Sequence, residues 1–528
     1  MDTVNYADLF ERSARLSPGR PALVDETGGQ TYAEVRSAAR RFAHALIARG
    51  FEPSSPYAFF SVNAGCALVS HIGAMMAGGA WTNINIKSTV ETNAGLLNRA
   101  GCKALFYHSS CKAEAIALLA EVPCLDIVVC LDADDGRHPS LARFIEDQPD
   151  ARVEIPFSYE GVGFMGTTGG TTGAPKITRA SHAYLALSAI SFMACFQFTR
   201  PPVNLAVAPI THAGGVLATG MLAMGGTVVL ITSTKPADIL AAIQKHQVSA
   251  VFLPPTLIYT LLNEPGLGQY DLTSLKYVIS AAAPIDADRI RAAFKSIGPV
   301  LCQAYGQTES GMPLTFMSPR EIGDAIADDA LAGRLASVGR PVASLKRLEI
   351  IDDDGNFLEP GAVGEIVISG PTVMREYLGD PEGSAEATHR GMHRTGDLGY
   401  LDNDGYLYIT DRKRDLIISG GFNVYPSQIE KIVLSHPAVL DCAVIGVAHP
   451  RWGEAVTAVV QTIPGKEVSE REIVEFTKLK AGSINAPKYV RIVEDLPKNS
   501  AGKILKRELR KLFENIGQID DNQEARNV

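Results

Sequence analysis

The sequence contains no residue pattern for a structural metal site or a disulfide framework. Its 528 residues include eight cysteines, with no Cys-x-x-Cys pair and no Cys/His cluster at zinc spacing. They are Cys66, Cys102, Cys111, Cys124, Cys130, Cys195, Cys302 and Cys442. We therefore expect reduced and mostly buried thiols.

Excess positive charge and long apolar runs are also missing. The formal net charge is −9, which is the wrong sign for a protein that coats nucleic acid. The longest apolar stretch, residues 64–81, includes Ser70, His71 and four glycines and is barely long enough to span a bilayer. The N-terminal residues lack the cationic start and apolar run of a secretion signal. We expect no nucleic-acid partner, no membrane segment and a cytoplasmic location.

What is present predicts a large, layered α/β protein. At roughly 100 to 200 residues per domain, the length corresponds to about three to five structural units. The β-branched run 227–231, the helical pattern 237–243 and the buried run 248–253 predict one βαβ unit. From Leu348 onward, short strand patterns with turn clusters at 352–356 and 402–405 predict a small β-rich subdomain.

A charged cluster at residues 411–415, Asp-Arg-Lys-Arg-Asp, separates two strand-like runs at 406–409 and 416–418. Such a cluster is ordinarily a solvated turn. Because this one lies between a large unit and a remainder of about a hundred residues, we predict a domain boundary there. The predicted domains are 1–411 and a small α+β domain at 412–528.

The most informative segment is residues 167–176, Thr-Thr-Gly-Gly-Thr-Thr-Gly-Ala-Pro-Lys. Glycines let a loop present backbone N–H groups, hydroxyls add donors and Lys176 adds a point charge, which together suit a polyphosphate. The segment is not a Walker loop, because Ile177 rather than Ser or Thr follows the lysine. The spacing of Gly161, Gly163 and Gly166 matches a dinucleotide motif, but no acidic residue follows within 176–235 to hold a ribose. We therefore predict a triphosphate site.

Four further segments are each weak alone. Residues 303–309, Gln-Ala-Tyr-Gly-Gln-Thr-Glu, offer an aromatic face for a base and a carboxylate for Mg²⁺. Residues 394–397, Arg-Thr-Gly-Asp, place a carboxylate on a predicted tight turn, suited to a ribose diol. Residues 416–426 predict a strand that enters a glycine turn, and residues 496–504 place Lys503 on a predicted mobile loop.

Taken in order, these five segments resemble the core motifs of the adenylate-forming superfamily, which includes acyl-CoA synthetases, aryl acid ligases and adenylation domains. The resemblance runs from about Leu9 to Leu512 and is closest to fatty-acyl-CoA and aromatic acyl-CoA ligases. It implies an α/β fold in which a large N-terminal domain of layered subdomains precedes a small mobile C-terminal domain. It also implies a two-step reaction, in which a carboxylate attacks Mg·ATP to give an acyl-adenylate and a nucleophile then displaces AMP.

The resemblance implies roles for individual residues. The phosphate-binding residues would be Thr168, Gly169, Gly170, Thr171, Thr172, Gly173 and Lys176. Tyr305 would stack on adenine with Thr308 nearby, Glu309 would bind Mg²⁺, and Asp397 would hold the ribose hydroxyls with Arg412 beside it. Lys503 would stabilise the transition state between the acid and the α-phosphate. Arg414 would be the hinge about which the C-terminal domain rotates, replacing Lys503 in the site with the Gly420–Gly421 face.

The acid pocket is predicted from the same resemblance. Its residues would be His212, Gly214, Ala281, Ala282 and Ala283. His212 occupies the position of a gating aromatic residue, and we count it with the catalytic residues as a gate without acid/base work. The small side chains at 281–283 leave room for a bulky or planar acid. No acidic residue lies between 176 and 238, so an α-ammonium group has no obvious partner.

The acceptor stays open at this point. CoA is the commonest acceptor in the matching subfamily, so we expect an acyl-CoA ligase for an aromatic or medium-chain acid. An amide bond synthetase, which passes the acyl group to an amine, is the alternative, and a carrier-protein thiol is a third acceptor within the same chemistry. A silent nucleotide-binding protein is disfavoured by the complete set of motifs.

Overall fold

The computed structural model describes residues 4–155, 157–158, 160–168, 175–498, 504–514 and 516. These residues form two compact units. The first contains the described parts of Met1–Thr168, Pro175–Leu348 and Ile368–His393, and the second those of Glu349–Val367 and Arg394–Val528. The two units are described separately below.

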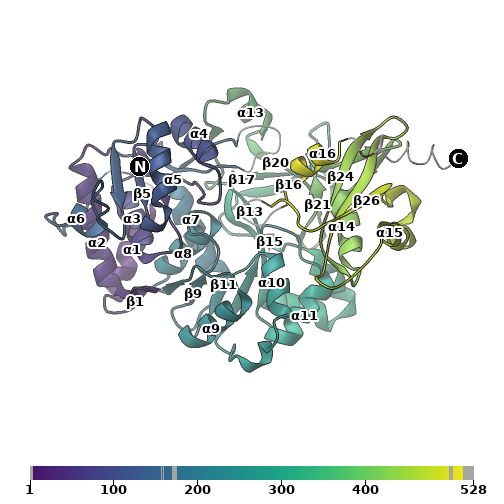
Figure 1. Ribbon diagram of the computed structural model, residues 1–528, viewed down its shortest axis with the longest axis horizontal. Helices are drawn as coiled ribbons and strands as arrows, with labels where there is room; N and C mark the ends of the chain where they lie inside the picture. The colour runs from purple at the N-terminus through teal and green to yellow at the C-terminus, as the bar shows by residue number, and fades with distance from the viewer. Residues whose placement is uncertain are drawn as a thin grey trace. The chain divides into compact units, whose positions relative to one another are not determined.

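The first unit contains two largely parallel sheets (Figure 1). Among the described residues, one has nine strands in the order β15-β14-β13-β12-β11-β9-β10-β1-β2 and the other has seven in the order β18-β8-β7-β4-β3-β5-β6. The strands of the first sheet are Arg340–Pro341, Gly311–Met317, Leu301–Gln307, Tyr277–Ser280, Ala250–Phe252, Val203–Ala206, Thr227–Leu230, Pro21–Asp25 and Gly28–Thr31 in that order. Those of the second are Glu376–Tyr377, Thr178–Ser181, Val162–Met165, Ala80–Thr82, Pro56–Phe60, Ala104–Tyr107 and Ile127–Cys130.

Helices cover the sheets in layers, and the main core lies between the two sheets. Six of the described helices contribute buried side chains to that core: α1 (Tyr6–Leu16), α2 (Tyr32–Ile47), α3 (Gly65–Met76), α6 (Leu141–Phe144), α7 (Ala183–Cys195) and α8 (Ala213–Ala223). A second core packs α9 (Pro236–His246), α10 (Pro255–Leu262), α11 (Ala287–Ile297) and α12 (Pro319–Ala327) on the nine-stranded sheet. A third packs α4 (Val90–Ala100) and α5 (Lys112–Glu121) on the seven-stranded sheet. The predicted layered α/β architecture is confirmed.

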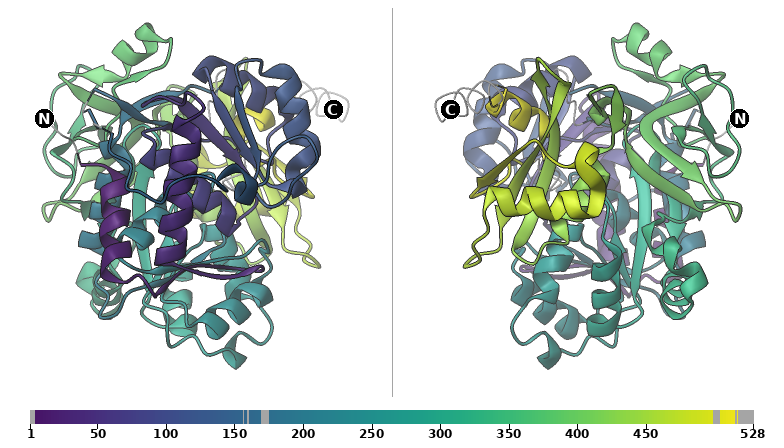
Figure 2. Two further views of the ribbon diagram at one scale, coloured as in Figure 1. Left: turned by 90° about the vertical axis from the view of Figure 1, so that its left-hand side faces the viewer. Right: turned by 90° about the vertical axis from the view of Figure 1, so that its right-hand side faces the viewer.

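Local sequence signals account for several of these elements. Thr31 and Glu34 form a reciprocal capping box at the start of α2, which fixes the step from β2 into this helix. Figure 2 shows α1 and α2, in purple, side by side. The predicted βαβ unit is β10-α9-β11, whose strands both pair in parallel with β9. The apolar stretch 64–81 supplies α3 and β4, and no helix within the described ranges is long and apolar enough to cross a membrane.

The β-rich region around and after Leu348 forms a five-stranded sheet. Its order is β16-β17-β20-β19 with β21 paired to β20, and the strands are Arg347–Ile351, Gly364–Ser369, Met392–Leu401, Thr388–His389 and Leu407–Arg412. The predicted turns at 352–356 and 402–405 are confirmed by the Asp352 N–H to Asn356 carbonyl bond and by the β20–β21 hairpin.

The second unit also contains a sheet with helices on both faces. The strands are β22 (Ile417–Ser419), β23 (Phe422–Val424), β24 (Val439–His449), β25 (Gly453–Thr462) and β26 (Tyr489–Val493). Helices α14 (Pro426–Leu434) and α15 (Glu470–Asn485) pack on one face and α16 (Lys506–Leu512) on the other. Figure 2 shows these helices, in yellow-green and yellow, against the sheet.

Candidate active site

The two ends of the predicted phosphate loop are held together by a strand ladder. The Thr168 N–H donates to the Lys176 carbonyl at 2.9 Å, and the Thr178 N–H donates to the Gly166 carbonyl at 2.8 Å. Ile177, which follows the lysine, forms a β-bridge with Thr167 and is 2% exposed. The chain therefore leaves the loop along a regular antiparallel ladder. Gly169, Gly170, Thr171, Thr172 and Gly173 lie outside the described residues.

The Gly161, Gly163 and Gly166 spacing is a feature of strand β7 and not of a dinucleotide loop. A Cβ at Gly163 would lie 2.5 Å from the His182 Cα, so this glycine allows β7 and the start of α7 to approach. At Gly166 a Cβ would lie 2.2 Å from the Thr308 methyl group. Gly166 thereby brings the start of the phosphate loop against the Tyr305–Glu309 segment.

Residues 303–309 form the end of β13 and the turn into β14. The Tyr305 side chain is 9% exposed, and its hydroxyl accepts a hydrogen bond from the Gln307 amide at 3.2 Å. Glu309 accepts a hydrogen bond from the Tyr377 hydroxyl at 3.2 Å, and its carbonyl accepts from the Met374 N–H at 2.6 Å. The predicted adenine and Mg²⁺ residues therefore lie on one hairpin beside the loop.

Lys176 is joined to the same region by two contacts. Its ammonium nitrogen lies 2.8 Å from the Asp380 carboxylate and 4.6 Å from the centre of the Tyr377 ring. The ammonium group holds the pKa of Asp380 below its usual range. Tyr377 thus contacts both the predicted phosphate lysine and the predicted Mg²⁺ carboxylate. Neither Tyr377 nor Asp380 carried any sequence signal for the site.

The predicted acid-pocket residues follow two parallel strands of the nine-stranded sheet. His212 comes after β9 and precedes α8, while Ala281, Ala282 and Ala283 follow β12 at the same carboxyl edge, with β11 between the two strands. Burial lowers the pKa of His212 to about 4, and its Nδ1 lies 3.0 Å from the Thr211 hydroxyl. Ala282 has φ 73°, an uncommon conformation for a residue with a Cβ.

Glycines allow α8 to begin directly against the segment that carries His212. A Cβ at Gly214 would lie 2.4 Å from the Ala208 carbonyl oxygen, and one at Gly215 would lie 2.0 Å from the Ile210 carbonyl oxygen. Because these neighbours are backbone atoms, a side chain at either position would require the backbone itself to shift. Gly214 is therefore a packing residue of the segment that carries His212.

Asn63, which the sequence did not single out, links the carboxyl edges of the two sheets. Its side-chain nitrogen lies 3.0 to 3.3 Å from the carbonyls of Ala206, Val207, Ala208 and Ile231. Its side-chain oxygen accepts a hydrogen bond from the Ile210 N–H at 3.0 Å. One amide thereby holds the segment that leads from β9 to His212.

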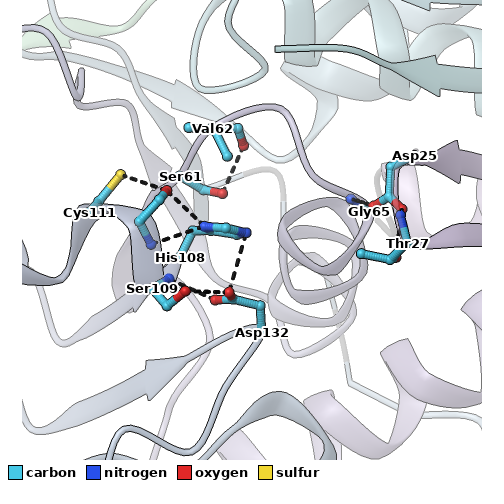
Figure 3. A network of polar contacts seen from close by, with 10 residues as sticks. Asp25, Thr27, Ser61, Val62, Gly65, His108, Ser109, Cys111 and Asp132 are labelled. Atoms are coloured by element: carbon cyan, nitrogen blue, oxygen red, sulfur yellow. Dashed lines mark hydrogen bonds and ion pairs between the residues drawn. The ribbon is translucent and has the colours of Figure 1, made fainter.

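A separate polar network joins the loops after β5 and β6 (Figure 3). His108 Nε2 lies 3.4 Å from Asp132, and the Ser110 hydroxyl lies 2.8 Å from His108 Nδ1. This order resembles a Ser-His-Asp triad, but Nδ1 also accepts the Ser110 N–H at 3.2 Å as the N-cap of the short helix η1 (Ser109–Cys111). Ser109 donates its N–H to Asp132 as well. These contacts therefore hold the two loops together and cap the helix η1.

The second unit holds Asp397 and Arg412 opposite each other on β20 and β21, with 3.3 Å between Asp397 Oδ1 and Arg412 Nε. The prediction of a tight turn at 394–397 is wrong, because β20 runs through these residues. Gly396 adopts φ 70° within the strand, and the Asp397 N–H donates to the Thr395 hydroxyl. Asp397 is a buried strand residue.

The charged cluster spans the end of β21 and the single turn η4 (Lys413–Asp415), which contains Arg414. Asp415 forms an ion pair with Arg510 at 2.9 Å. Beyond it, Gly420 (φ 59°) and Gly421 (φ 82°) form the predicted glycine turn between β22 and β23, where both residues need left-handed backbone.

Lys503 lies outside the described residues. The chain on either side of it is paired as an isolated bridge between Lys498 and Ile504. Three neighbouring basic residues form ion pairs within the second unit: Lys498 with Asp441, Lys506 with Glu430 and Arg510 with Asp415. These cations stabilise the fold of the unit.

Comparison with known proteins identifies relatives along the whole chain. The family model described as AMP-binding enzyme matches residues 10–378, and the model of the AMP-binding enzyme C-terminal domain matches residues 428–503. A feruloyl-CoA synthase from Amycolatopsis sp. is 31% identical over 505 residues, which cover 95% of this chain and 98% of that protein. An indoleacetate–CoA ligase from Aromatoleum aromaticum is 30% identical over 515 residues, covering 96% and 98%.

Solved structures are equally similar. The amide bond synthetase McbA from Marinactinospora thermotolerans has a TM-score of 0.86 and 31% identity, covering 96% of this chain and 100% of that one. The ATP-bound structure of MatB from Rhodopseudomonas palustris has a TM-score of 0.86 and 29% identity, covering 97% and 100%.

Proposed function

The chain belongs to the AMP-binding enzyme family and is an AMP-forming acid ligase, and we propose that it transfers an aromatic or medium-chain acyl group from its adenylate to the thiol of CoA. The observation that carries this proposal is the family match over both parts of the chain, together with two near full-length relatives that are named CoA ligases. The similarity to an amide bond synthetase supports the alternative, in which an amine is the acceptor.

In the first step, an oxygen of the acid's carboxylate attacks the α-phosphorus of ATP and the bond to pyrophosphate breaks. Residues 168–176 with Lys176 would bind the β- and γ-phosphates, and Tyr305 and Thr308 would contact the adenosine part. Asp397 and Arg412 are the proposed ribose residues, and Lys503 would stabilise the charge that develops at the α-phosphate. The protein contributes position and electrostatic stabilisation.

Glu309 is the proposed residue for Mg²⁺. It supplies a hard carboxylate oxygen on the hairpin beside the phosphate loop, and Mg²⁺ typically combines one or two carboxylates with substrate phosphates and water. When bound, the ion would neutralise phosphate charge during the departure of pyrophosphate. The described residues contain no cluster of three or more candidate metal ligands, and this proposed site needs none.

In the second step, the acceptor sulfur attacks the acyl carbonyl, the bond to AMP breaks and the thiol proton leaves. We place the domain boundary between 411 and 412 and the hinge at Arg414. Rotation there would withdraw Lys503 and present the Gly420–Gly421 turn, so that one site serves both steps. The turn η4 puts Arg414 between β21 and β22, where a change of backbone angles would reorient everything that follows.

A group of aromatic and cationic side chains in the second unit is suited to the nucleotide end of CoA. The Trp452 ring stacks on His449 with 4.2 Å between centroids, and Arg451 and Lys488 lie 5.5 and 5.7 Å from the Trp452 ring centre. The Gly420 N–H donates to the Trp452 carbonyl at 2.8 Å, which joins this group to the glycine turn. An aromatic plate with nearby cations fits a base and a phosphate.

The residues of the proposed acid pocket limit which class of acid can bind. Ala281, Ala282 and Ala283 present small side chains at the carboxyl edge where His212 also lies, which leaves room for a planar acid. The segment 177–237 contains no acidic residue to pair with an α-ammonium group. An aromatic or medium-chain acid without that group is therefore the proposed substrate class.

Incubation with ATP, Mg²⁺, hydroxylamine and a panel of acids tests the first step, because hydroxylamine converts an acyl-adenylate to a hydroxamate. An enzyme of the proposed class forms acid-dependent hydroxamate and pyrophosphate. Absence of both with every aromatic and medium-chain acid would overturn the proposal.

The second step is tested in parallel reactions with the best acid, one with CoA and one with a primary amine, analysed by mass. We expect the thioester and faster AMP release with CoA. If saturating CoA does neither while the amine gives amide in quantity, the acceptor is an amine. Trp452→Ala adds a site-specific arm, since it should raise the KM for CoA and leave hydroxamate formation unchanged.

A further inference from the structure

We propose that Tyr377 and Asp380 are positioning residues of the nucleotide site, and that Asp380 holds Lys176 until a triphosphate displaces it. We call these two residues the clamp. The inference rests on the proposed function, in which Lys176 binds the β- and γ-phosphates. It assigns a role to Tyr377 and Asp380, which lie far along the sequence from the phosphate loop.

The backbone brings the clamp to the loop. Strand β18 pairs antiparallel with β8, the strand that leaves the phosphate loop, with Tyr377 opposite Thr178. The Leu378 N–H also donates to the Ile177 carbonyl at 2.8 Å. The clamp is therefore fixed to the residue that follows Lys176 and cannot drift from it without breaking sheet hydrogen bonds.

Tyr377 connects the two proposed ligands of Mg·ATP. Its hydroxyl donates to Glu309 at 3.2 Å, while the face of its ring lies 4.6 Å from the Lys176 ammonium nitrogen. The ring attracts the cation and the hydroxyl orients the carboxylate. One rigid side chain thereby sets the separation between a phosphate-binding cation and a metal-binding anion.

Asp380 uses its two oxygens for different tasks. Oδ1 accepts the Gly383 N–H at 2.8 Å and caps α13 (Pro381–Glu386), while Oδ2 lies 2.8 Å from the Lys176 nitrogen. A Cβ at Gly383 would lie 2.4 Å from that nitrogen, so the absence of a side chain there lets the ion pair pack against the helix start. The cap keeps the carboxylate in place whether or not Lys176 stays bound.

The charges of this arrangement compete with the substrate. A bound triphosphate needs the Lys176 ammonium group, and the fixed Asp380 carboxylate then lies beside phosphates of the same sign. Both groups of the pair are partly exposed, with 43% and 35% of their side chains accessible, so separating them costs little. The pair can reform as pyrophosphate leaves, which favours release of that product.

Asp380→Asn separates these roles, because asparagine preserves the helix cap and the shape while it removes the charge. We expect equilibrium titration to show ATP and pyrophosphate binding about two- to fivefold tighter, the range for an exposed ion pair. AMP, which lacks the β- and γ-phosphates, should bind as to the wild type. The gain should fade in high salt, since exposed charges are screened.

Tyr377→Phe tests the other half. It retains the ring over Lys176 and removes the hydroxyl on Glu309, so ATP binding without Mg²⁺ should be unchanged. The Mg²⁺ concentration for half-maximal enhancement of ATP binding should rise severalfold. Glu376→Gln is the matched control, since it removes an exposed ion pair with Arg179 on the same strand and should change neither titration.

The outcomes separate this inference from the proposed function. If the wild type binds ATP and Lys176→Ala weakens it, but Asp380→Asn binds ATP no more tightly than the wild type, the clamp is refuted alone. An equal gain for AMP and ATP refutes it too. If the wild type binds no ATP, or Lys176→Ala binds it equally well, the proposed phosphate site fails and the clamp fails with it.

Discussion

Replacing Asn63 by alanine should weaken the attachment of the segment that carries His212, and so perturb the proposed acid pocket, although Asn63 itself is not expected to touch the substrate. In the structure, the Asn63 side-chain nitrogen donates to carbonyl groups at the ends of β9 and β10, and its side-chain oxygen accepts a hydrogen bond from the Ile210 N–H. Its two hydrogens can satisfy two of the four nearby carbonyls at once, and its oxygen satisfies Ile210. His212 follows two residues after Ile210, so the segment that Asn63 holds is the one that carries the proposed gate.

The cost follows from burial. Ile210 is 0% exposed, so an unpaired N–H there costs about 1–3 kcal/mol, and two lost amide bonds add about 1 kcal/mol each before water replaces them. We expect a net loss of about 2–4 kcal/mol in the stability of the first unit. The exposed Asn98, whose side chain makes a single bond to the Glu121 carbonyl, is the matched control, and Asn98→Ala should cost under about 1 kcal/mol.

The assay combines denaturant unfolding with steady-state pyrophosphate release. Asn63→Ala should raise the KM for the acid by about tenfold while the KM for ATP changes less than about twofold, because the Asn63 side chain bonds to the segments after β9 and β10 and to none of the described residues of the predicted phosphate loop. This tenfold is an estimate equal to about 1.4 kcal/mol of lost binding. Stability within about 0.5 kcal/mol of the wild type, together with an unchanged KM for the acid, would refute the reasoning.

Three other changes have defined outcomes. Lys503→Ala should lose about 10²-fold or more of acid-dependent pyrophosphate release while a supplied acyl-adenylate is still consumed, and near-normal release would end the assignment. Arg414→Pro should spare one half-reaction and cripple the other, because proline fixes φ near −65°; equal losses in a folded variant would indicate a structural turn. Burial lowers the pKa of His71 from 6.5 to about 3, so the folded state resists protonation and stability should fall by about 2 kcal/mol from pH 7 to pH 5 on this account. Denaturation of His71→Phe at both pH values should show a flatter dependence, and an identical slope would contradict the assignment.

Sequence patterns predicted those parts of the fold that depend on neighbours in the chain. The unit β10-α9-β11 was predictable because β-branched runs and helical spacing are local. The glycine turn at Gly420–Gly421 needs left-handed backbone at two adjacent positions, and two adjacent glycines predict that conformation directly.

The error at 394–397 has a physical cause. Thr-Gly-Asp has turn chemistry, and Gly396 does adopt φ 70°, but pairing with β21 holds the strand through that residue. The preference of a single glycine is worth less than a ladder of hydrogen bonds supplied by a second strand. A local pattern cannot report a partner strand, so the conformation of the residue was predictable and the element was not.

The site residues that were missed act through distant contacts. Asn63, Tyr377 and Asp380 are common residue types in ordinary surroundings, and only the pairing of β18 with β8 or the meeting of two sheet edges gives them their partners. The resemblance to known motifs found groups that would touch substrate. It did not find the groups that hold them.

The proposed nucleotide-binding cations share one property that bears on how ATP would bind. Lys176 pairs with Asp380 in the first unit, and Arg412 pairs with Asp397 in the second. Binding a triphosphate to Lys176 exchanges one anionic partner for another, and it does not neutralise a free positive charge. Affinity for ATP should therefore depend less on salt than it would at a site with an unpaired lysine, because salt weakens the attraction of Lys176 for Asp380 as well as its attraction for the phosphates. It also follows that removing the carboxylate partner is the more informative mutation, since loss of the cation should weaken binding whether or not the pair matters, while loss of the anion changes affinity only if the exchange takes place.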